Sequence, residues 1–375
     1  MNLIANVRTR IWANRVSHVK RYMAGKVQLN VKIGEEVQPQ DVLGTALISA
    51  GFSSVNIAKM LGVPPSEGGK YLQRALGKII YKGELLAFKK GMFGEKAIKA
   101  PTDGLVEFYD DKTGELRLQL MPKTVSLIAG VFGIIDDVNY DKNEVTIKTM
   151  VTEVFGILGS GKERGGILDI IGNQGGLVNQ SQIKVTMHQH VLVAGSLVDG
   201  SVLKSAAGFG LSGIICGGLN VNDYKAITGG VDPGTRFGTD IGISVMATEG
   251  FGLLPMGDDI FSLIEPFNNK FVFIHGNARK LLLPTATSDS ILTMRKIDLA
   301  LNKSPDITPE VEMGEISIGN KVRIVWPPFM GLQGQVLAID QTPTVLDSGI
   351  STILLTIETL KQKLRVPFVN IEIIK

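Results

Sequence analysis

Small and polar residues that could hold a ligand follow three apolar runs in the middle of the chain. The runs are residues 190–194, 213–216 and 243–247, and continuous apolar runs of this length are typical of buried parallel strands. The residues that directly follow these runs in the sequence include Gly195, Gly217, Gly218, Asn220, Thr248, Glu249 and Gly250. Because ligands bind at the carboxyl ends of parallel strands, the pattern predicts a ligand site with Glu249 as its charged group. Tight strand–helix turns explain the same glycines without a ligand and are the favoured interpretation.

Residues 156–162, Gly-Ile-Leu-Gly-Ser-Gly-Lys, have the spacing of a phosphate-binding loop, in which backbone amides and a lysine hold a nucleotide. Glu163 stands where such a loop needs Ser or Thr for magnesium, and Arg164-Gly-Gly cannot open the helix that the phosphate requires. We therefore interpret this stretch as a turn.

Two histidines and one cysteine complete the candidates for chemistry. His188 and His190 would face the same side of a strand, as metal ligands should, but the sequence identifies no third ligand. Cys216 ends an apolar run, which is the environment of an inert thiol. The sequence therefore assigns no catalytic residue, no metal and no cofactor, and it favours a protein that is not an enzyme.

One short pattern occurs three times between residues 100 and 171. A glycine opens an apolar strand, a polar turn follows, and an alternating strand returns; the glycines are Gly104, Gly133 and, in a weaker third copy, Gly156. This is the pattern of a β-hairpin. A lone hairpin cannot bury its apolar face, so the three units must pack on one another or on another part of the chain.

Between residues 172 and 295 the chain is rich in glycine, and helical patterns alternate with the apolar runs. The helix candidates are residues 199–206, 222–227 and 258–264, and residues 271–274 are a fourth strand candidate. Alternating strands and helices predict a small α/β domain.

Composition sets the broad class of the protein. The chain has 375 residues, of which 20% are charged, and Cys216 is its single cysteine. This length suggests two to four domains, and the longest apolar run, residues 125–135, is far shorter than the ~20 residues of a membrane span. A lone cysteine suits a reducing compartment, and the first residues lack the features of a secretory signal. We expect a soluble protein of the cytoplasm.

The first 30 residues carry a local positive charge: Arg8, Arg10, Arg15, Lys20, Arg21 and Lys26, with no acid. Apolar residues recur there mainly every three or four positions, which predicts an amphipathic helix within residues 1–23 that could bind an anionic membrane surface or a partner. Residues 7–11 equally alternate as a strand does. A packed N-terminal element with a solvated basic side is the favoured interpretation.

Residues 24–122 resemble the barrel-sandwich hybrid of biotinyl and lipoyl carrier domains. The resemblance rests on the Gly34-Glu-Glu-Val and Pro39-Gln-Asp-Val-Leu-Gly turns, on Lys82-Gly-Glu-Leu-Leu-Ala, and on Ala100-Pro-Thr-Asp-Gly-Leu-Val. A helical insertion, residues 53–78, separates the two halves; we expect one helix from Ser54 to Gly62 and a second over residues 69–76. Asp111-Lys112-Thr113 is similar to the modified lysine motif but follows the half-motif that it should precede. We therefore expect a scaffold module without a prosthetic group.

Residues 315–375 resemble the KOW motif of ribosomal proteins and transcription elongation factors, with Gly319, Val322, Ile324, Gly331, Gly334 and Val336 at its strand-loop-strand spacing. The resemblance implies a small SH3-like barrel that binds nucleic acid or protein. The candidate partner-binding residues are Lys321, Arg323, Trp326, Phe329 and Met330. Basic and aromatic side chains suit phosphates and bases, but the loop around residues 327–334 is neutral and apolar, which favours a protein partner. Packing of the barrel on its neighbours in the same chain is the alternative.

The predicted fold class is mixed, mainly β with a small α/β domain. Its order is a basic segment at 1–23, a barrel-sandwich hybrid at 24–122, tandem β-hairpins at 123–171, an α/β domain at 172–295, a linker at 296–314 and a KOW/SH3-like barrel at 315–375. This order resembles that of bacterial KOW-motif proteins and implies no activity. The leading hypothesis is a binding or assembly protein that acts on a protein partner or on itself. The alternatives are a nucleic-acid-associated protein, a ligand-binding or enzymatic α/β domain, and a peripheral membrane protein.

Overall fold

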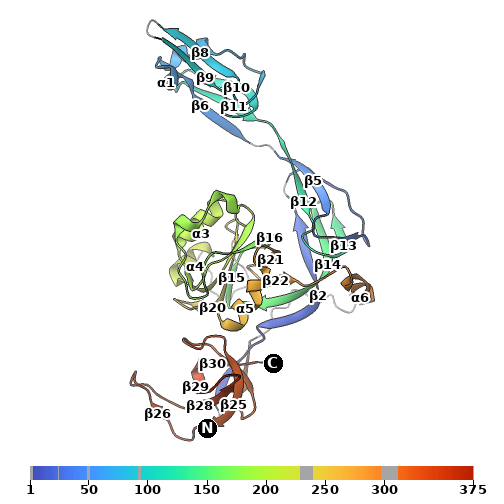
Figure 1. Ribbon diagram of the computed structural model, residues 1–375, viewed down its shortest axis with the longest axis vertical. Helices are drawn as coiled ribbons and strands as arrows, with labels where there is room; N and C mark the ends of the chain where they lie inside the picture. Colours follow the sequence, from blue (N-terminus) through green and yellow to red (C-terminus); the bar gives the residue numbers. More distant parts are fainter. Residues whose placement is uncertain are drawn as a thin grey trace. The chain divides into compact units, whose positions relative to one another are not determined.

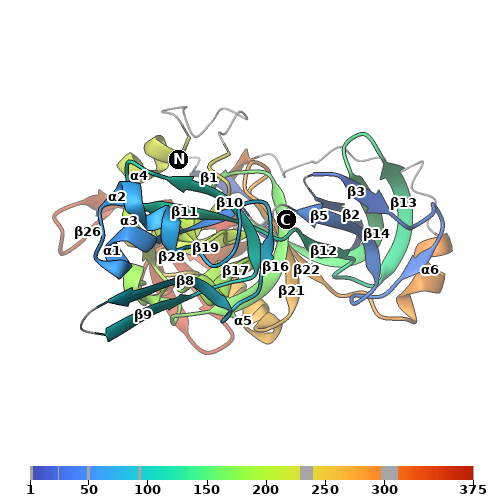
Figure 2. The same ribbon diagram turned by 90° about the horizontal axis from the view of Figure 1, so that it is seen from above.

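The computed structural model describes residues 3–23, 25–48, 51–91, 94–228, 240–296 and 311–374. The fold is mainly β with several sheets, and none of the sheets formed by these residues closes into a barrel (Figures 1 and 2). The chain forms two compact units. The body comprises Met1–Arg21, Val31–Asp41 and Ile128–Lys375, and the β module comprises Tyr22–Asn30 and Val42–Leu127. Of the predicted linker 296–314, residues 297–310 lie outside the described residues.

The largest sheet lies in the body and is built around four parallel strands. In spatial order it contains β15 (Leu158–Ser160), β20 (Ser244–Phe251), β19 (Gly213–Leu219), β17 (His190–Val193), β16 (Glu163–Ile170), β21 (Phe271–His275), β22 (Lys280–Pro284), β14 (Glu144–Phe155), β13 (Gly133–Asn139) and β4 (Glu36–Val37), with β18 (Leu197–Val198) beside β19 and β2 (Ile11–Tyr22) beside β14. Strands β16, β17, β19 and β20 run parallel to one another, whereas β15 and β21 pair antiparallel with the two outer strands of this group. This confirms the parallel strands expected from the three apolar runs, and β21 confirms the fourth strand.

Helices cover both faces of these parallel strands, which explains why the strands are apolar throughout. Helices α3 (Gly200–Gly208) and α4 (Val221–Ile227) pack on one face, and α5 (Asp258–Ile264) packs on the other (Figure 1). The carboxylate of Asp199 caps the start of α3, and the side chain of Asn220 caps α4. All three helices confirm the sequence prediction. Helix α6 (Ser290–Lys296) packs beside β13 and β14.

A second sheet of the body joins segments from opposite ends of the sequence. Its order is β23 (Glu312–Glu315), β1 (Ile4–Val7), β30 (Ile371–Ile373), β24 (Lys321–Ile324), β25 (Gln333–Ile339), β28 (Leu354–Thr359) and β29 (Lys363–Pro367), and β26 (Thr344–Val345) pairs with β27 (Ser351–Thr352) nearby in the sequence. Apolar residues from most of these strands share one core.

The N-terminal helix predicted within residues 1–23 is wrong, because β1 and β2 are strands. Strand β1 lies between β23 and β30, and β2 pairs with β14. Helical spacing of the apolar residues is a weak signal when distant strands offer a complete set of backbone hydrogen bonds. The amphipathic helix that suggested membrane binding is therefore absent from the described residues of this segment.

Two of the three predicted hairpins are confirmed. Strands β10 (Gly104–Asp110) and β11 (Glu115–Leu120) pair antiparallel, as do β13 and β14. The third hairpin is wrong, since β15 pairs with β20 while β16 pairs with β17 and β21. The turn at Gly161 (φ 100°) sends the chain to the neighbouring part of the large sheet, where β16 gains a partner on each side.

The β module contains a four-stranded sheet of order β6 (Phe52–Asn56), β11, β10 and β7 (Ile79–Ile80), and a three-stranded sheet of β12 (Lys123–Ile128), β5 (Val42–Ile48) and β3 (Val27–Leu29). Strands β8 (Leu85–Gly91) and β9 (Gly94–Lys99) form a hairpin. Helix α1 (Ile57–Leu61) ends at Gly62 as expected, but Asn56 caps it instead of Ser54. The second predicted helix, residues 69–76, is wrong. Helix α2 (Pro65–Gly68) lies before this range, because Pro65 is a favourable first helical residue, and a 3-10 turn, Gly69–Tyr71, covers only the first three residues of the range.

Candidate functional site: a buried charge cluster

The glycines at the ends of the parallel strands pack against the chain's own backbone. A Cβ atom on Gly217 would lie 2.0 Å from the carbonyl oxygen of Leu254, and one on Gly218 would lie 1.9 Å from that of Gly252. Gly195 has a φ of 65°, and a Cβ there would lie 2.2 Å from the carbonyl oxygen of Gly176. The space expected for a ligand is therefore filled at these three positions by neighbouring loops of the body.

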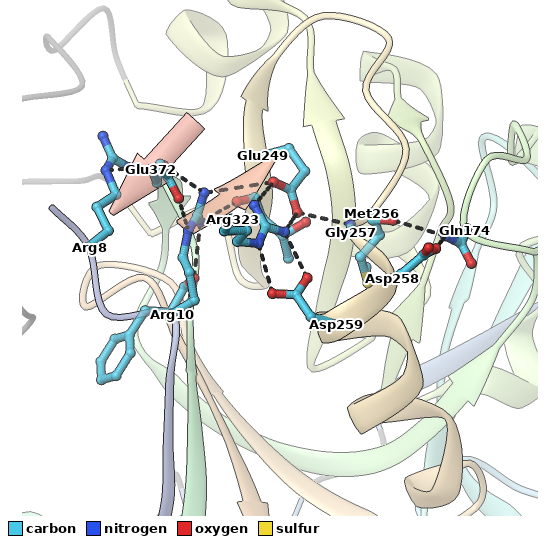
Figure 3. Close-up of polar contacts among 12 residues, drawn as sticks. Arg8, Arg10, Gln174, Glu249, Met256, Gly257, Asp258, Asp259, Arg323 and Glu372 are labelled. Carbon is cyan, nitrogen blue, oxygen red and sulfur yellow. Dashed lines mark hydrogen bonds and ion pairs between the residues drawn. The ribbon is translucent and has the colours of Figure 1, made fainter. Parts of the chain in front are cut away.

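Glu249, the charged residue expected at this sheet edge, binds an arginine from the C-terminal sheet. The guanidinium of Arg323 donates two hydrogen bonds of 2.9 Å to the Glu249 carboxylate (Figure 3). It also donates bonds of 2.8 and 3.0 Å to Asp259, at the start of α5. The backbone N–H of Gly257 donates to Glu249 at 3.0 Å. The Arg323 side chain is fully buried, so this fork joins the α/β part of the body to strand β24.

The connection between β1 and β2 adds a second arginine fork. Arg10 donates hydrogen bonds of 2.9 and 3.1 Å to Glu372 on β30, and one of 2.7 Å to the carbonyl oxygen of Thr248. A nitrogen of Arg10 also lies 3.7 Å from Glu249, and the Nε atom of Arg8 lies 3.4 Å from Glu372. We call this set the charge cluster; it comprises Arg8, Arg10, Glu249, Asp259, Arg323 and Glu372.

In the charge cluster, burial and neighbouring opposite charges shift the pKa values of the buried groups in opposite directions. For Glu249 and Arg323 the opposite charges have the larger effect. Burial alone would raise the pKa of Glu249, but the charge and hydrogen bonds of Arg323, with Arg10 and Gly257, hold that pKa below its ordinary value. Burial alone would lower the pKa of Arg323, but Glu249 and Asp259 raise it. Both groups are therefore charged at neutral pH. A paired and hydrogen-bonded arrangement of this kind is the condition under which buried charges are tolerated.

The structure places three of the five candidate partner-binding residues of the KOW-like segment, Arg323, Phe329 and Met330, against the rest of the body. Arg323 is enclosed in the charge cluster, and Met330 is buried with its carbonyl oxygen accepting a 3.2 Å hydrogen bond from the N–H of Asp258. Phe329 is partly buried against the core of the C-terminal sheet. Lys321 and Trp326 remain exposed. The apolar tip of the loop thus docks on the start of α5 in the same chain.

Sequence reasoning named Glu249 and Arg323 but assigned them to two different sites, and it missed Asp259 and Glu372. Strand alternation places Val322 and Ile324 in the core of the C-terminal sheet, so Arg323 was expected to face solvent. An acid directly after an apolar strand was the available signal for Glu249. Nothing in the sequence indicates that these two residues meet.

The remaining candidates for chemistry have separate local partners. Asn220 caps a helix, Thr248 donates a 3.3 Å hydrogen bond to the carbonyl oxygen of Cys216, and Gly250 lies in β20 with a φ of 132°. His188 contacts the carbonyl oxygen of Phe209 at 3.2 Å, whereas His190 contacts Asp169 at 2.6 Å. Burial raises the pKa of the Cys216 thiol. Within the described ranges, no three His, Cys, Asp or Glu side chains are grouped as metal ligands would be.

The β module presents a second notable surface on the solvent side of its four-stranded sheet. Phe52, Phe108 and Ile79 are 55%, 56% and 44% exposed, and Leu105 is partly exposed beside them. A β-bulge between Val106 and Phe108 turns both Glu107 and Phe108 outward. Arg117 lies between the two phenylalanines: it pairs with Phe108 across the strands, and its guanidinium lies 3.7 Å from the Phe52 ring centroid. We call Phe52, Ile79, Leu105, Glu107, Phe108 and Arg117 the open face.

No helix in the described part of the chain is long and apolar enough to cross a membrane. No protein-family model matches the chain, and no curated protein matches it.

Proposed function

We propose that the protein is an assembly protein without catalytic activity, and that it associates with a second copy of itself through the open face of the β module. The single observation that carries this proposal is the group of exposed aromatic and aliphatic side chains on one sheet face. Apolar side chains scattered singly on a surface need no explanation, but a contiguous group marks an interaction site.

The charges of the open face favour a second copy over an unrelated partner. Glu107 and Arg117 lie side by side, with 2.9 Å between the Glu107 Oε2 and Arg117 Nε atoms. In a two-fold symmetric dimer the same patch meets itself, so each acid can face the partner's base and each phenylalanine can cover the partner's apolar residues. A patch that carries both signs of charge beside exposed apolar side chains meets this condition.

The charge cluster, which lies in the body, supports the proposal of an assembly protein without catalytic activity. It commits Arg323 and Glu249, the best candidates for nucleic-acid and small-ligand binding, to contacts within the chain. The body then acts as a rigid support in which the N-terminal strands, the α/β part and the C-terminal sheet are bound together. We place the protein in the cytoplasm, because its one cysteine is buried and suits a reducing compartment.

The finer fold assignments are part of this proposal. We propose that the C-terminal sheet is a KOW/SH3-like module, which is supported by the antiparallel β24–β25 hairpin and by the shared burial of Val322, Ile324 and Val336. We propose that the β module is a barrel-sandwich hybrid with an insertion. The support is that residues of the insertion, Ile57 and Leu61, share a single core with residues that follow it, from Ile80 to Leu118.

Sedimentation velocity over a concentration series tests the proposal. We expect the full chain to form a dimer, and the double variant Phe52→Ser/Phe108→Ser to weaken the association at least about tenfold, since each side chain loses buried apolar area worth on the order of 1.5 kcal/mol or more. Met60→Ser is the matched control, because Met60 is 54% exposed on α1 of the same unit and outside the open face.

Charge reversal adds a test of the two-fold arrangement. Arg117→Glu should weaken the dimer by placing like charges opposite each other, and Arg117→Glu/Glu107→Arg should restore it. A full chain that stays monomeric up to concentrations of about 100 μM, where contacts of this class associate, would refute the proposal. So would a dimer that the phenylalanine double variant leaves unchanged.

A further inference from the structure

A small hollow of the body is lined by three arginines. Arg8, Arg10 and Arg279 surround it together with Phe155 and Val311, and its cavity volume is about 30 Å³. This space exceeds the roughly 10–15 Å³ that a single water molecule requires. It therefore has room for about two water-sized groups, such as the oxygen atoms of a small anion, and Phe155 and Val311 make part of its lining apolar.

Two of the three guanidiniums have donors that no described residue satisfies. Arg10 is committed to Glu372 and Thr248. The Nε atom of Arg8 is buried without a hydrogen-bond partner, and its carboxylate contact, with Glu372, is 3.4 Å long. Arg279 makes one long hydrogen bond of 3.4 Å, to the carbonyl oxygen of Ile157, and no ion pair with any residue in the described ranges. A buried donor without a partner costs free energy that an acceptor would restore.

The local field also favours an anion. Burial lowers the pKa of Arg8, and the charges of Arg10 and Arg279 act in the same direction, whereas Glu372 and Glu249 oppose the shift. Arg10 and Arg279 therefore both repel the Arg8 guanidinium. An anion bound between these guanidiniums would offset their repulsion by its attraction to each of them.

We propose that this hollow binds the oxyanion head group of a small ligand, a phosphate or a carboxylate. Planar guanidiniums with several fixed N–H donors match both head groups and bind them with paired hydrogen bonds. The site holds residues from the β1–β2 connection, from the end of β14 and from the β21–β22 turn. A bound anion would consequently strengthen the joint between these segments, next to the charge cluster.

The backbone of Arg279 allows a clean test. Its φ is 54°, in the left-handed region that asparagine tolerates better than most residues. Arg279→Asn therefore removes the charge and the fork while keeping the turn. Arg365→Asn is the control, because it removes an equal charge from an exposed position of the C-terminal sheet.

The experiment is isothermal titration of the full chain with inorganic phosphate and with acetate, each against sodium chloride of equal ionic strength, together with thermal unfolding in the same solutions. We expect saturable binding of one of the two probes and a rise in unfolding temperature that follows its concentration. Arg279→Asn should weaken binding at least about tenfold, and Arg365→Asn should not change it.

Each outcome decides the matter. Preference for phosphate or for acetate identifies the head group. No saturable binding of either probe, or binding that Arg279→Asn leaves intact, overturns the proposal. Phosphorus NMR of Arg279→Asn at low temperature, where the variant is folded, separates lost affinity from lost stability. Because the open face is not involved, failure here leaves the dimer proposal standing.

Discussion

Removing the guanidinium of Arg323 is the most direct test of how the body is held together. The substitution Arg323→Met keeps most of the apolar stem and deletes four hydrogen bonds, two to Glu249 and two to Asp259. Glu249 would remain buried, with the N–H of Gly257 at 3.0 Å and Arg10 at 3.7 Å as its remaining partners.

The size of the effect follows from this geometry. Deleting one partner of a buried ion pair costs about 3–5 kcal/mol, because the other charge is left without compensation. Glu249 retains two weaker partners, so we expect the lower end of that range, about 3 kcal/mol. This corresponds to a change of more than about a hundredfold in the unfolding equilibrium. Arg323→Lys, which keeps the charge but cannot reach both carboxylates at once, should lose about half as much.

Urea unfolding followed by tryptophan fluorescence measures the loss, and limited proteolysis shows whether the C-terminal sheet separates from the rest of the body. Arg365→Met is the matched control, since Arg365 forms an exposed ion pair with Asp340 in the same sheet. Exposed pairs contribute about 0–1 kcal/mol. If Arg323→Met cost no more than Arg365→Met, the charge cluster would not be the element that joins the parts of the body.

Three further predictions follow from the same body. Because the pKa of Glu249 is lowered in the folded state, its stabilisation is present above the ordinary glutamate pKa of 4.5 and is lost as the pH falls through the lower folded-state pKa. The urea midpoint should therefore fall on acidification below that ordinary value, and fall less in Glu249→Gln. Cys216 should resist thiol reagents in the native protein and react after unfolding, since burial raises its pKa; fast labelling of the native chain would contradict this. Gly218→Ala should lower the free energy of unfolding by about 1–3 kcal/mol, because its Cβ would lie 1.9 Å from the Gly252 carbonyl oxygen. Gly208→Ala on α3 is the control and should be neutral or stabilising, since its Cβ would have no atom within 4 Å. Equal thermal unfolding midpoints for the two variants would refute the packing argument.

The α/β part of the body was predictable because its signals are local. Each parallel strand is a short apolar run, and a helix follows β17, β19 and β20 within about ten residues; Asp199 and Asn220 cap the first two of these helices, and α5 has no side-chain cap. Covered sheets produce such runs regardless of which strand lies beside which. Strand and helix positions could therefore be assigned without knowledge of the tertiary contacts.

The errors arise where distant residues decide the outcome. Strand β1 has its partners at Glu312–Glu315 and Ile371–Ile373, more than 300 residues away, so helical spacing within the segment could not compete. Strand β15 finds β20 instead of the adjacent β16. In the same way, the hydrogen-bonded residues Arg323 and Glu249 are 74 positions apart in the sequence. The residue pattern of a single strand does not indicate such a contact.

The pairing of Asn6 with Glu372 has a consequence for biosynthesis. At about 5–20 residues per second, a ribosome needs roughly 20–70 s to travel from one to the other. Strand β1 lacks both of its neighbours until β23 is synthesised, and it lacks β30 until the end of that interval. Meanwhile its apolar residues are available to chaperones or to the edge strands of other nascent chains. Completion of the C-terminal sheet is thus a late event, and a chain that stalls shortly before residue 371 would carry the whole α/β part and yet lack the strand that seats its beginning.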